Sequence, residues 1–87
     1  MVRAKFKVTS ITRNMGSVRV RDENGVEKWE KGEIQTVKLS PVTDGSEENK
    51  RFYAASPCGH IELGSVNAEA NRQFVLDGEY YIDFTPV

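Results

Sequence analysis

The stretch Val2–Thr9, which reads VRAKFKVT, decides the fold class. Apolar side chains occupy every second position, Val2, Ala4, Phe6 and Val8, and basic side chains lie between them. A period of two is typical of a half-buried β-strand, whereas a helix would place basic residues beside the apolar ones. The sequence therefore predicts a strand with an apolar inner face and a basic outer face.

This first strand is expected to be interrupted and then to continue into a hairpin. Ile11 falls on the basic parity, which predicts a bulge or the strand end near Ser10. Met15–Gly16 is expected to break the strand. The segment Asp22–Gly25 contains Asn-Gly, the strongest short hairpin signal, because both central residues of a type I′ turn have positive φ. We expect Val26–Glu30 to form the returning strand.

The rest of the chain reads as short strands separated by turns. Lys31–Gly32 predicts a second, weaker turn, and the strand after it should end near Pro41, which lacks an amide donor. Thr43–Lys50 contains no apolar residue and predicts a mobile acidic loop. The expected strands of this part of the chain are Glu33–Val42, Arg51–Ala55, His60–Leu63 and Glu79–Thr85.

One short helix is predicted, over about residues 68–74. Asn67 is suited to accept the free amides of its first turn, and Glu69 lies at its positive end. Ala70 and Phe74 are four residues apart and define the buried stripe.

Together these elements predict a single, mostly β domain over residues 1–87. We expect a small antiparallel β-barrel or sandwich of six to seven short strands, with the helix before the last strand. Closure of the sheet, or pairing of edges in a homo-oligomer, would remove exposed edge strands. The expected core consists of apolar residues that share parity within their strands, plus the helix stripe: Phe6, Val8, Val20, Leu39, Ile61, Leu63, Phe74, Ile82 and Phe84.

The composition excludes several classes of protein. No apolar run of the 87-residue chain approaches the ~20 residues of a membrane span. Nor does any continuous apolar stretch reach the about 7–15 residues of a signal peptide. Cys58 is the only cysteine, so no intrachain disulfide forms, and a reducing cytosol is expected.

Groups for catalysis or metal binding are sparse. Cys58 and His60 lie two residues apart, but no oxyanion site or third orienting group is marked near them. They supply only half of a zinc site, and Asp44, Glu47 and Glu48 lack the spacing of a calcium loop. We therefore expect no enzyme activity, no metal site and no cofactor.

Charge is distributed unevenly along the chain. Residues 1–21 carry six basic residues and no acidic one, whereas residues 22–87 carry six basic and thirteen acidic residues, a net charge of −7. The expected binding surface is the basic face of the first strand with a flank from the hairpin: Arg3, Lys5, Lys7, Arg19 and Arg21. The opposing interpretation is that acidic residues such as Glu62 and Asp83 lie across neighbouring strands and neutralise it.

Two kinds of partner fit such a basic stripe. It would attract an acidic patch on a protein, or it would bind single-stranded nucleic acid if Trp29, Tyr53 and Tyr81 face outward to stack on bases. The pI near 5.8 argues against nucleic acid, because nucleic-acid-binding domains are usually strongly basic.

Residues 46–84 resemble a group of small uncharacterised proteins encoded by tailed bacteriophages. The resemblance is carried by Ser46-Glu47-Glu48-Asn49-Lys50-x-Phe52 and by Pro57-x-Gly59-x-Ile61-x-Leu63. It continues through Asn67, Ala70, Phe74 and Gly78 into Tyr80-Tyr81-x-Asp83-Phe84. It implies a viral protein made in the cytoplasm of a bacterial host, and it transfers no catalytic residue.

The resulting functional hypothesis is a non-enzymatic phage accessory protein that binds a protein partner, such as a host factor, through its basic strand face. The alternative is a single-stranded nucleic-acid-binding β-barrel. A pocket for a small anionic or nucleotide ligand between protomers, and a component of the virion, stay open as further alternatives. No membrane partner is expected.

Overall fold

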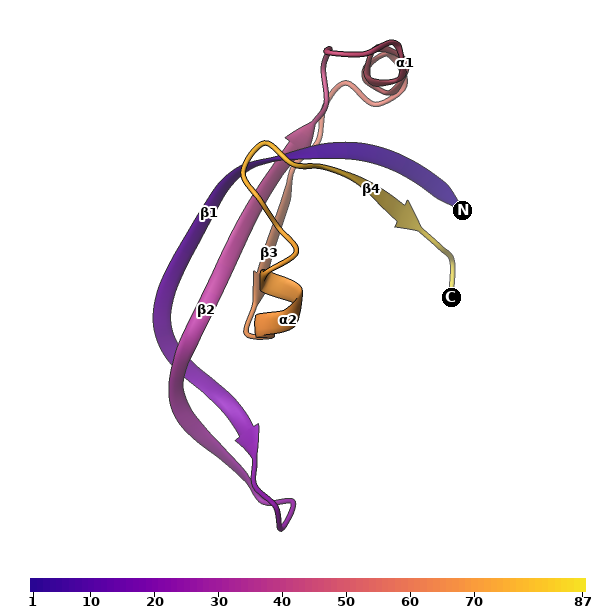
Figure 1. The fold of residues 1–87 in the computed structure, drawn as a ribbon. Coiled ribbons are helices and arrows are strands. Elements are labelled where there is room, and N and C mark those ends of the chain that lie inside the picture. The colour runs from indigo at the N-terminus through magenta and orange to yellow at the C-terminus, as the bar shows by residue number, and fades with distance from the viewer.

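The computed structural model describes residues 1–87 as one open, four-stranded antiparallel sheet with two short helices (Figure 1). The strand order is β3-β2-β1-β4. In chain order the elements are β1 (Val2–Arg21), β2 (Glu27–Pro41), α1 (Glu47–Ala55), β3 (Ile61–Ser65), α2 (Ala68–Asn71) and β4 (Glu79–Phe84). The mostly β prediction is confirmed. The prediction of a closed barrel or sandwich with six to seven strands is wrong.

The two central strands are much longer than predicted. β1 runs through Met15–Gly16, and β2 runs through Lys31–Gly32, so the predicted break and second turn are both wrong. Gly16 pairs with Gly32 in the antiparallel register, and the small residues allow the strands to continue side by side. The predicted strand end at Pro41 is confirmed.

The hairpin between β1 and β2 turns where predicted but in a different conformation. The Asp22 side chain accepts hydrogen bonds from the amides of Asn24 and Val26, each at 2.9 Å. Of the turn residues, only Gly25 has a positive φ, of 78°, so the prediction of a type I′ turn is wrong. The aspartate side chain closes the turn in place of a second left-handed residue.

A bulge in β1 changes which of its side chains face the core. The register with β2 shifts between Val8 and Ser10, as the parity of Ile11 predicted. Before the shift even-numbered residues face the core, and after it odd-numbered residues do. β2 has no interruption, so its odd-numbered residues share one face along its whole length.

The core is small and lies on one face of the sheet. Its buried hydrophobic residues are Ala4, Phe6, Val8, Val37, Leu39 and Val42. Ile11, Ile61, Phe74, Tyr80 and Ile82 are partly buried against the main cluster. Three of the predicted core residues are outside it. Val20 follows the bulge on the even parity and therefore faces away from the core, whereas Leu63 and Phe84 lie on the edge strands and are 48% and 55% exposed.

The helices cover opposite faces of the sheet. The segment containing α2 and Phe74 packs on the core face, whereas α1 contacts Lys5 and Tyr81 on the other face. Asn67 caps α2 as predicted, although the helix ends at Asn71 rather than Phe74. Residues 47–50 were predicted as loop and residues 51–55 as strand, and both predictions are wrong because they form α1.

A two-stranded arm extends beyond the part of the sheet that the other elements cover. We define the arm as residues 13–35; from Asn14 to Ile34 its strands pair only with each other. In Figure 1 the arm curves down and away from α1 and β4. The radius of gyration is 16.4 Å, compared with about 12 Å for a compact domain of this length.

Candidate functional site

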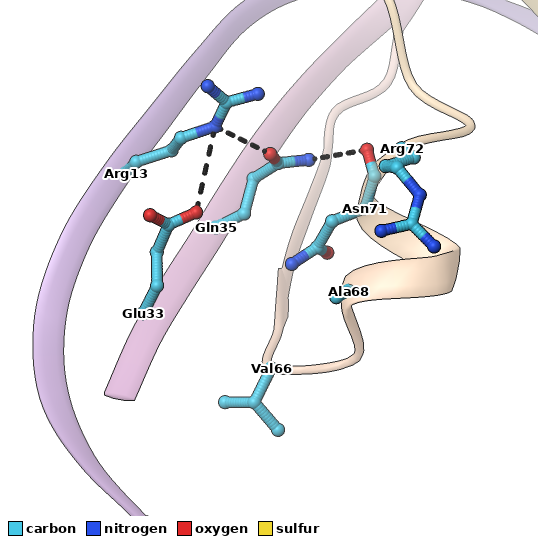
Figure 2. Close-up of a pocket in the computed structure, with 7 residues that line it drawn as sticks. All are labelled: Arg13, Glu33, Gln35, Val66, Ala68, Asn71 and Arg72. Carbon is cyan, nitrogen blue, oxygen red and sulfur yellow. Dashed lines mark hydrogen bonds and ion pairs between the residues drawn. The ribbon is translucent and has the colours of Figure 1, made fainter. Parts of the chain in front are cut away.

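A pocket of about 370 Å³ lies where the arm joins the rest of the molecule (Figure 2). Figure 2 shows side chains from β1 and β2 on one side and from the α2 segment on the other. The lining residues are Arg13, Glu33, Gln35, Val66, Ala68, Asn71 and Arg72. The pocket therefore joins the arm face to the α2 segment.

Gln35 is a buried residue of this pocket that connects its two sides. Its side chain is only 2% exposed, which is rare for a glutamine, and each end of its amide makes a hydrogen bond. Its Oε1 accepts from Arg13 Nε at 3.0 Å, and its Nε2 donates to the carbonyl of Asn71 at 3.0 Å. Gln35 thus links β1, β2 and the end of α2.

The pocket carries two guanidinium groups on different elements. Arg13 Nε lies 3.8 Å from Glu33, and Arg72 pairs with Glu69. The side chains of Arg13 and Arg72 are 64% and 65% exposed. Apart from the bond from Arg13 to Gln35 and the bond from Arg72 to Glu69, these two side chains donate no hydrogen bond within the protein. Most of their N–H groups are therefore available to a partner.

The face of the arm that continues from the core carries exposed apolar side chains. Met15 pairs with Glu33, and Trp29 pairs with Arg19, on the odd parity of both strands. Met15 is 59% exposed and Trp29 is 65% exposed. The Arg19 guanidinium lies 5.4 Å from the centre of the Trp29 ring. We call this odd-parity surface the arm face.

The opposite face of the arm is covered by its own side chains. A Cβ on Gly16 would meet the Ile34 side chain at 2.7 Å, and a Cβ on Gly32 would meet Val18 at the same distance. Ile34 and Val18 therefore fold over the glycine pair and are half-buried. The contrast leaves Met15 and Trp29 as the exposed large apolar side chains of the paired strands of the arm.

The structure places the predicted basic residues on two different faces. Arg3, Lys5 and Lys7 lie opposite the core, before the bulge, whereas Arg19 and Arg21 lie on the arm face, after it. The flank and the centre of the predicted stripe are therefore not brought together. The sequence predicted a bulge near Ser10. The prediction did not take into account that the bulge turns Arg19 and Arg21 to the other face of the sheet.

Each predicted basic residue has an acidic neighbour. Arg3 donates two hydrogen bonds to Asp83 at 2.7 and 2.9 Å, and its guanidinium lies over the Tyr81 ring. Lys7 lies 3.9 Å from Asp77. On the arm, Glu27 pairs with both Arg19 and Arg21, at 3.4 and 3.2 Å.

Lys5 is the most enclosed of the five basic residues. Its side chain is 11% exposed, and its Nζ lies 3.5 Å from both Glu48 and Glu79. Burial alone would lower the pKa of Lys5, but the two carboxylates outweigh it and raise that pKa. This arrangement fastens α1 to the sheet and leaves little of the Lys5 charge accessible.

The same cluster perturbs two further groups. The hydrogen bond from Tyr81 lowers the pKa of Glu48, with Lys5 acting in the same direction against the effect of burial. Donation to that carboxylate, together with burial, raises the pKa of Tyr81. The Tyr81 ring also packs against Phe52, at 6.1 Å between ring centres, so it is engaged within the molecule.

The other candidate residues do not form a second site. Tyr53 is 44% exposed on α1, distant in sequence and on another element from Trp29. Cys58 and His60 are both exposed, and no group of three or more His, Cys, Asp or Glu side chains is arranged to hold a metal ion. Neither helix has the length and apolarity required to span a bilayer.

The chain matches no protein-family model, no curated protein and no solved structure.

Met15, Gln35 and Arg13 were not predicted as site residues. Met15 was interpreted as part of a strand break, so the long two-stranded arm was not predicted. The parity of Gln35 with Val37 and Leu39 was the available signal, because it places a polar residue on the buried face of β2.

Proposed function

We propose that this protein is a non-enzymatic binding protein that docks a protein partner on the arm face and the adjoining pocket. The carrying observation is the exposure of Met15 and Trp29 on an arm that no other element covers. An isolated two-stranded hairpin is at best marginally stable in water. A partner on this face would bury both side chains and support the arm.

The residue types on this surface are those enriched in protein interfaces. Trp, Met and Arg are over-represented in such interfaces, and Trp and Arg are frequent among the residues that dominate affinity. The arm face presents Trp29, Met15 and Arg19 together, and Arg13 and Arg72 lie at its base. Such a set supports an apolar centre with a polar, charged rim.

The charge of the arm favours protein over nucleic acid. It carries five basic residues, Arg13, Arg19, Arg21, Lys28 and Lys31, and five acidic residues, Asp22, Glu23, Glu27, Glu30 and Glu33. A net charge of zero gives little attraction to a phosphate backbone, whose binding depends on an excess of cations. Opposite charges side by side suit a protein surface of mixed sign.

The proposed surface differs in part from the one predicted from the sequence. Only Arg19 and Arg21 of the predicted residues lie on the arm face. Arg3 and Lys5 are engaged with Asp83, Glu48 and Glu79, so we do not place them in the binding surface. The resemblance to small phage proteins supports an accessory role for the protein inside a bacterial cell.

The proposal is tested by affinity capture that depends on the arm face. A tagged chain is made in bacterial cells that also make an untagged copy, and every protein retained with the tagged chain is identified. We expect at least one protein, the untagged copy included, to be retained in stoichiometric amount. The Met15→Ser, Trp29→Ser variant should lose it, because the apolar centre of the interface is removed.

The matched control is Tyr53→Ser, which removes an exposed aromatic residue from α1 instead of the arm. It should retain the same protein. The proposal is contradicted if retention is equal in both variants, or if the material retained through the arm is nucleic acid.

A further inference from the structure

We infer that the protein docked on the arm face is a second copy of this chain, joined arm to arm in antiparallel orientation. The inference rests on the proposed function, since it names the occupant of the same surface. In such a dimer the acidic tip of each arm lies at the basic pocket of the other copy.

The chain exposes enough area for a stable interface. The accessible surface is 6512 Å², whereas a compact monomer of 9.8 kDa exposes about 5,200 Å². The excess of about 1,300 Å² is larger than the ~800 Å² per partner of a standard stable interface. The arm contributes to this excess, because only two strands run beside each other there.

The two ends of the arm are complementary in charge. The tip, residues 21–27, carries Asp22, Glu23 and Glu27 against Arg21, a net charge of −2. The Glu23 side chain makes no ion pair or hydrogen bond within the chain. At the base of the arm, Arg13 and Arg72 present unused N–H donors around the pocket (Figure 2).

The two large apolar residues of the arm face lie at equal distances from the middle of the arm. From the Arg13–Gln35 pair to the Arg21–Glu27 pair the ribbon covers eight residue steps, and its central pair is Ser17–Lys31. Trp29 lies two steps toward the tip, and Met15 lies two steps toward the base. A two-fold axis at the central pair therefore brings Trp29 of each copy to the level of Met15 of the other.

The same axis brings the tip of each arm to the base of its partner. The distance from base to tip is about 27 Å at the usual rise of a strand. It is the same in both copies by symmetry, so both tips reach the base of the partner arm. One operation thus pairs Trp29 with Met15 and Glu23 with Arg13 and Arg72 twice over. Those groups are the two large apolar side chains of the arm face, the unpaired Glu23 and the two guanidinium groups of the pocket that keep unused N–H donors.

The inference is tested with the purified full chain by sedimentation equilibrium from about 1 to about 100 µM. We expect a reversible species of twice the 9.8 kDa chain mass that accumulates as concentration rises. Trp29→Ser should raise its dissociation constant at least about tenfold, and Tyr53→Ser should leave the constant unchanged. A single species of one chain mass over the whole range overturns the inference.

Charge reversal tests the antiparallel arrangement itself. Glu23→Lys alters the tip, and Arg13→Glu with Arg72→Glu alters the base, so each variant alone should dimerise about tenfold more weakly or worse. A mixture of the two restores opposite charges at both junctions and should recover wild-type association. Failure of the mixture to recover, with both variants folded by circular dichroism, overturns tip-to-base pairing.

The two proposals fail in different ways. If the purified chain stays monomeric while affinity capture through Trp29 retains another protein, the second copy is excluded and the proposed function stands. If the chain stays monomeric and nothing is retained through Trp29, both are excluded.

Discussion

Lys5 shows how one side chain can be basic in the sequence and yet supply little free charge. It lies between Glu48 and Glu79, with its ammonium 5.6 Å from the centre of the Tyr81 ring. A carboxylate at this position would face two others in a mostly covered site, and like charges at this range repel. Lys7, on the same face, is 44% exposed, and its one ion pair is with the exposed Asp77 at 3.9 Å.

We therefore expect Lys5→Glu to lower the denaturant midpoint of unfolding clearly and Lys7→Glu to change it little. The physical reason is the enclosure of Lys5 by two carboxylates, which Lys7 lacks. Urea unfolding followed by circular dichroism measures both midpoints. Equal midpoints for the two variants would show that Lys5 does not fasten α1 to the sheet.

Gln35 allows a second prediction for a single residue. Gln35→Met keeps the volume of the side chain but removes both hydrogen bonds, to Arg13 and to the carbonyl of Asn71. The Asn71 carbonyl would keep only the long hydrogen bond from the Phe74 amide, at 3.4 Å, and Arg13 Nε would lose its acceptor. We expect the loss of the two bonds to lower the unfolding free energy by about 1–3 kcal/mol. Gln73→Met is the control, because Gln73 is exposed. A loss no larger than that of the control would contradict the organising role of Gln35.

Strand parity predicted the facing of individual residues well where the strand is regular. Phe6, Val8 and Leu39 are buried as expected, because alternation over Val2–Val8 has one consistent register. It could not predict which of those residues other elements cover. Leu63 and Phe84 share the core-facing parity, yet both lie on edge strands and stay exposed, and Val20 faces the other side because the bulge reverses the parity before it.

At the level of elements, α1 differs most from what the sequence predicted. Phe52 and Tyr53 are adjacent and favoured a strand, whereas the helix depends on its first turn. The Ser46 hydroxyl accepts from the amide of Asn49 at 3.0 Å, and Glu47 and Glu48 lie at the positive end of the helix. That capping signal was present in the sequence and outweighs the local β preference.

The attachment of α1 to the sheet should depend on pH. The pKa of Glu48 is lowered in the folded state, by the Tyr81 hydroxyl first and then by Lys5. A depressed pKa means that the folded state favours the carboxylate. The stabilisation is therefore complete above the ordinary glutamate pKa and is lost as pH falls through the folded value.

We expect Glu48→Gln to lower the melting temperature at pH 7 and to have progressively less effect toward about pH 3. Glu47→Gln is the control, since Glu47 is more exposed and contacts only Lys50. Melting curves over this range provide the measurement. A difference between Glu48→Gln and wild type that stays constant with pH would show that the carboxylate charge is not what holds α1.

Across the whole molecule, the number and closure of strands could not be predicted from local patterns. The sequence indicates where a strand alternates, but closure depends on pairing between segments far apart in the chain. Here β4 pairs with β1 and β3 pairs with β2, at the two edges of the sheet, and the edges do not meet. Glycine pairing and a continuous ladder also joined four predicted segments into two long strands.

The small core makes a prediction about two phenylalanines that looked equivalent in the sequence. Phe6 is 7% exposed, and Phe84 is 55% exposed at the corner of the sheet beside Val2. We expect Phe6→Ala to cost about 3–5 kcal/mol of unfolding free energy, because it removes a buried ring and leaves a cavity in the core. Phe84→Ala should cost at most about 1 kcal/mol. Similar losses measured by denaturant unfolding would contradict the position of the core.

The central claim is that the arm face is a docking surface for protein, and photo-crosslinking from that face in living cells tests it most directly. A benzophenone amino acid replaces Trp29 in one variant and Tyr53 in a second, and adducts are identified by mass spectrometry after irradiation. The account predicts a discrete protein adduct from position 29, composed of two copies of this chain if the dimer forms, and none of comparable yield from position 53. Equal yields from both positions, no adduct from position 29, or an adduct with nucleic acid would contradict it.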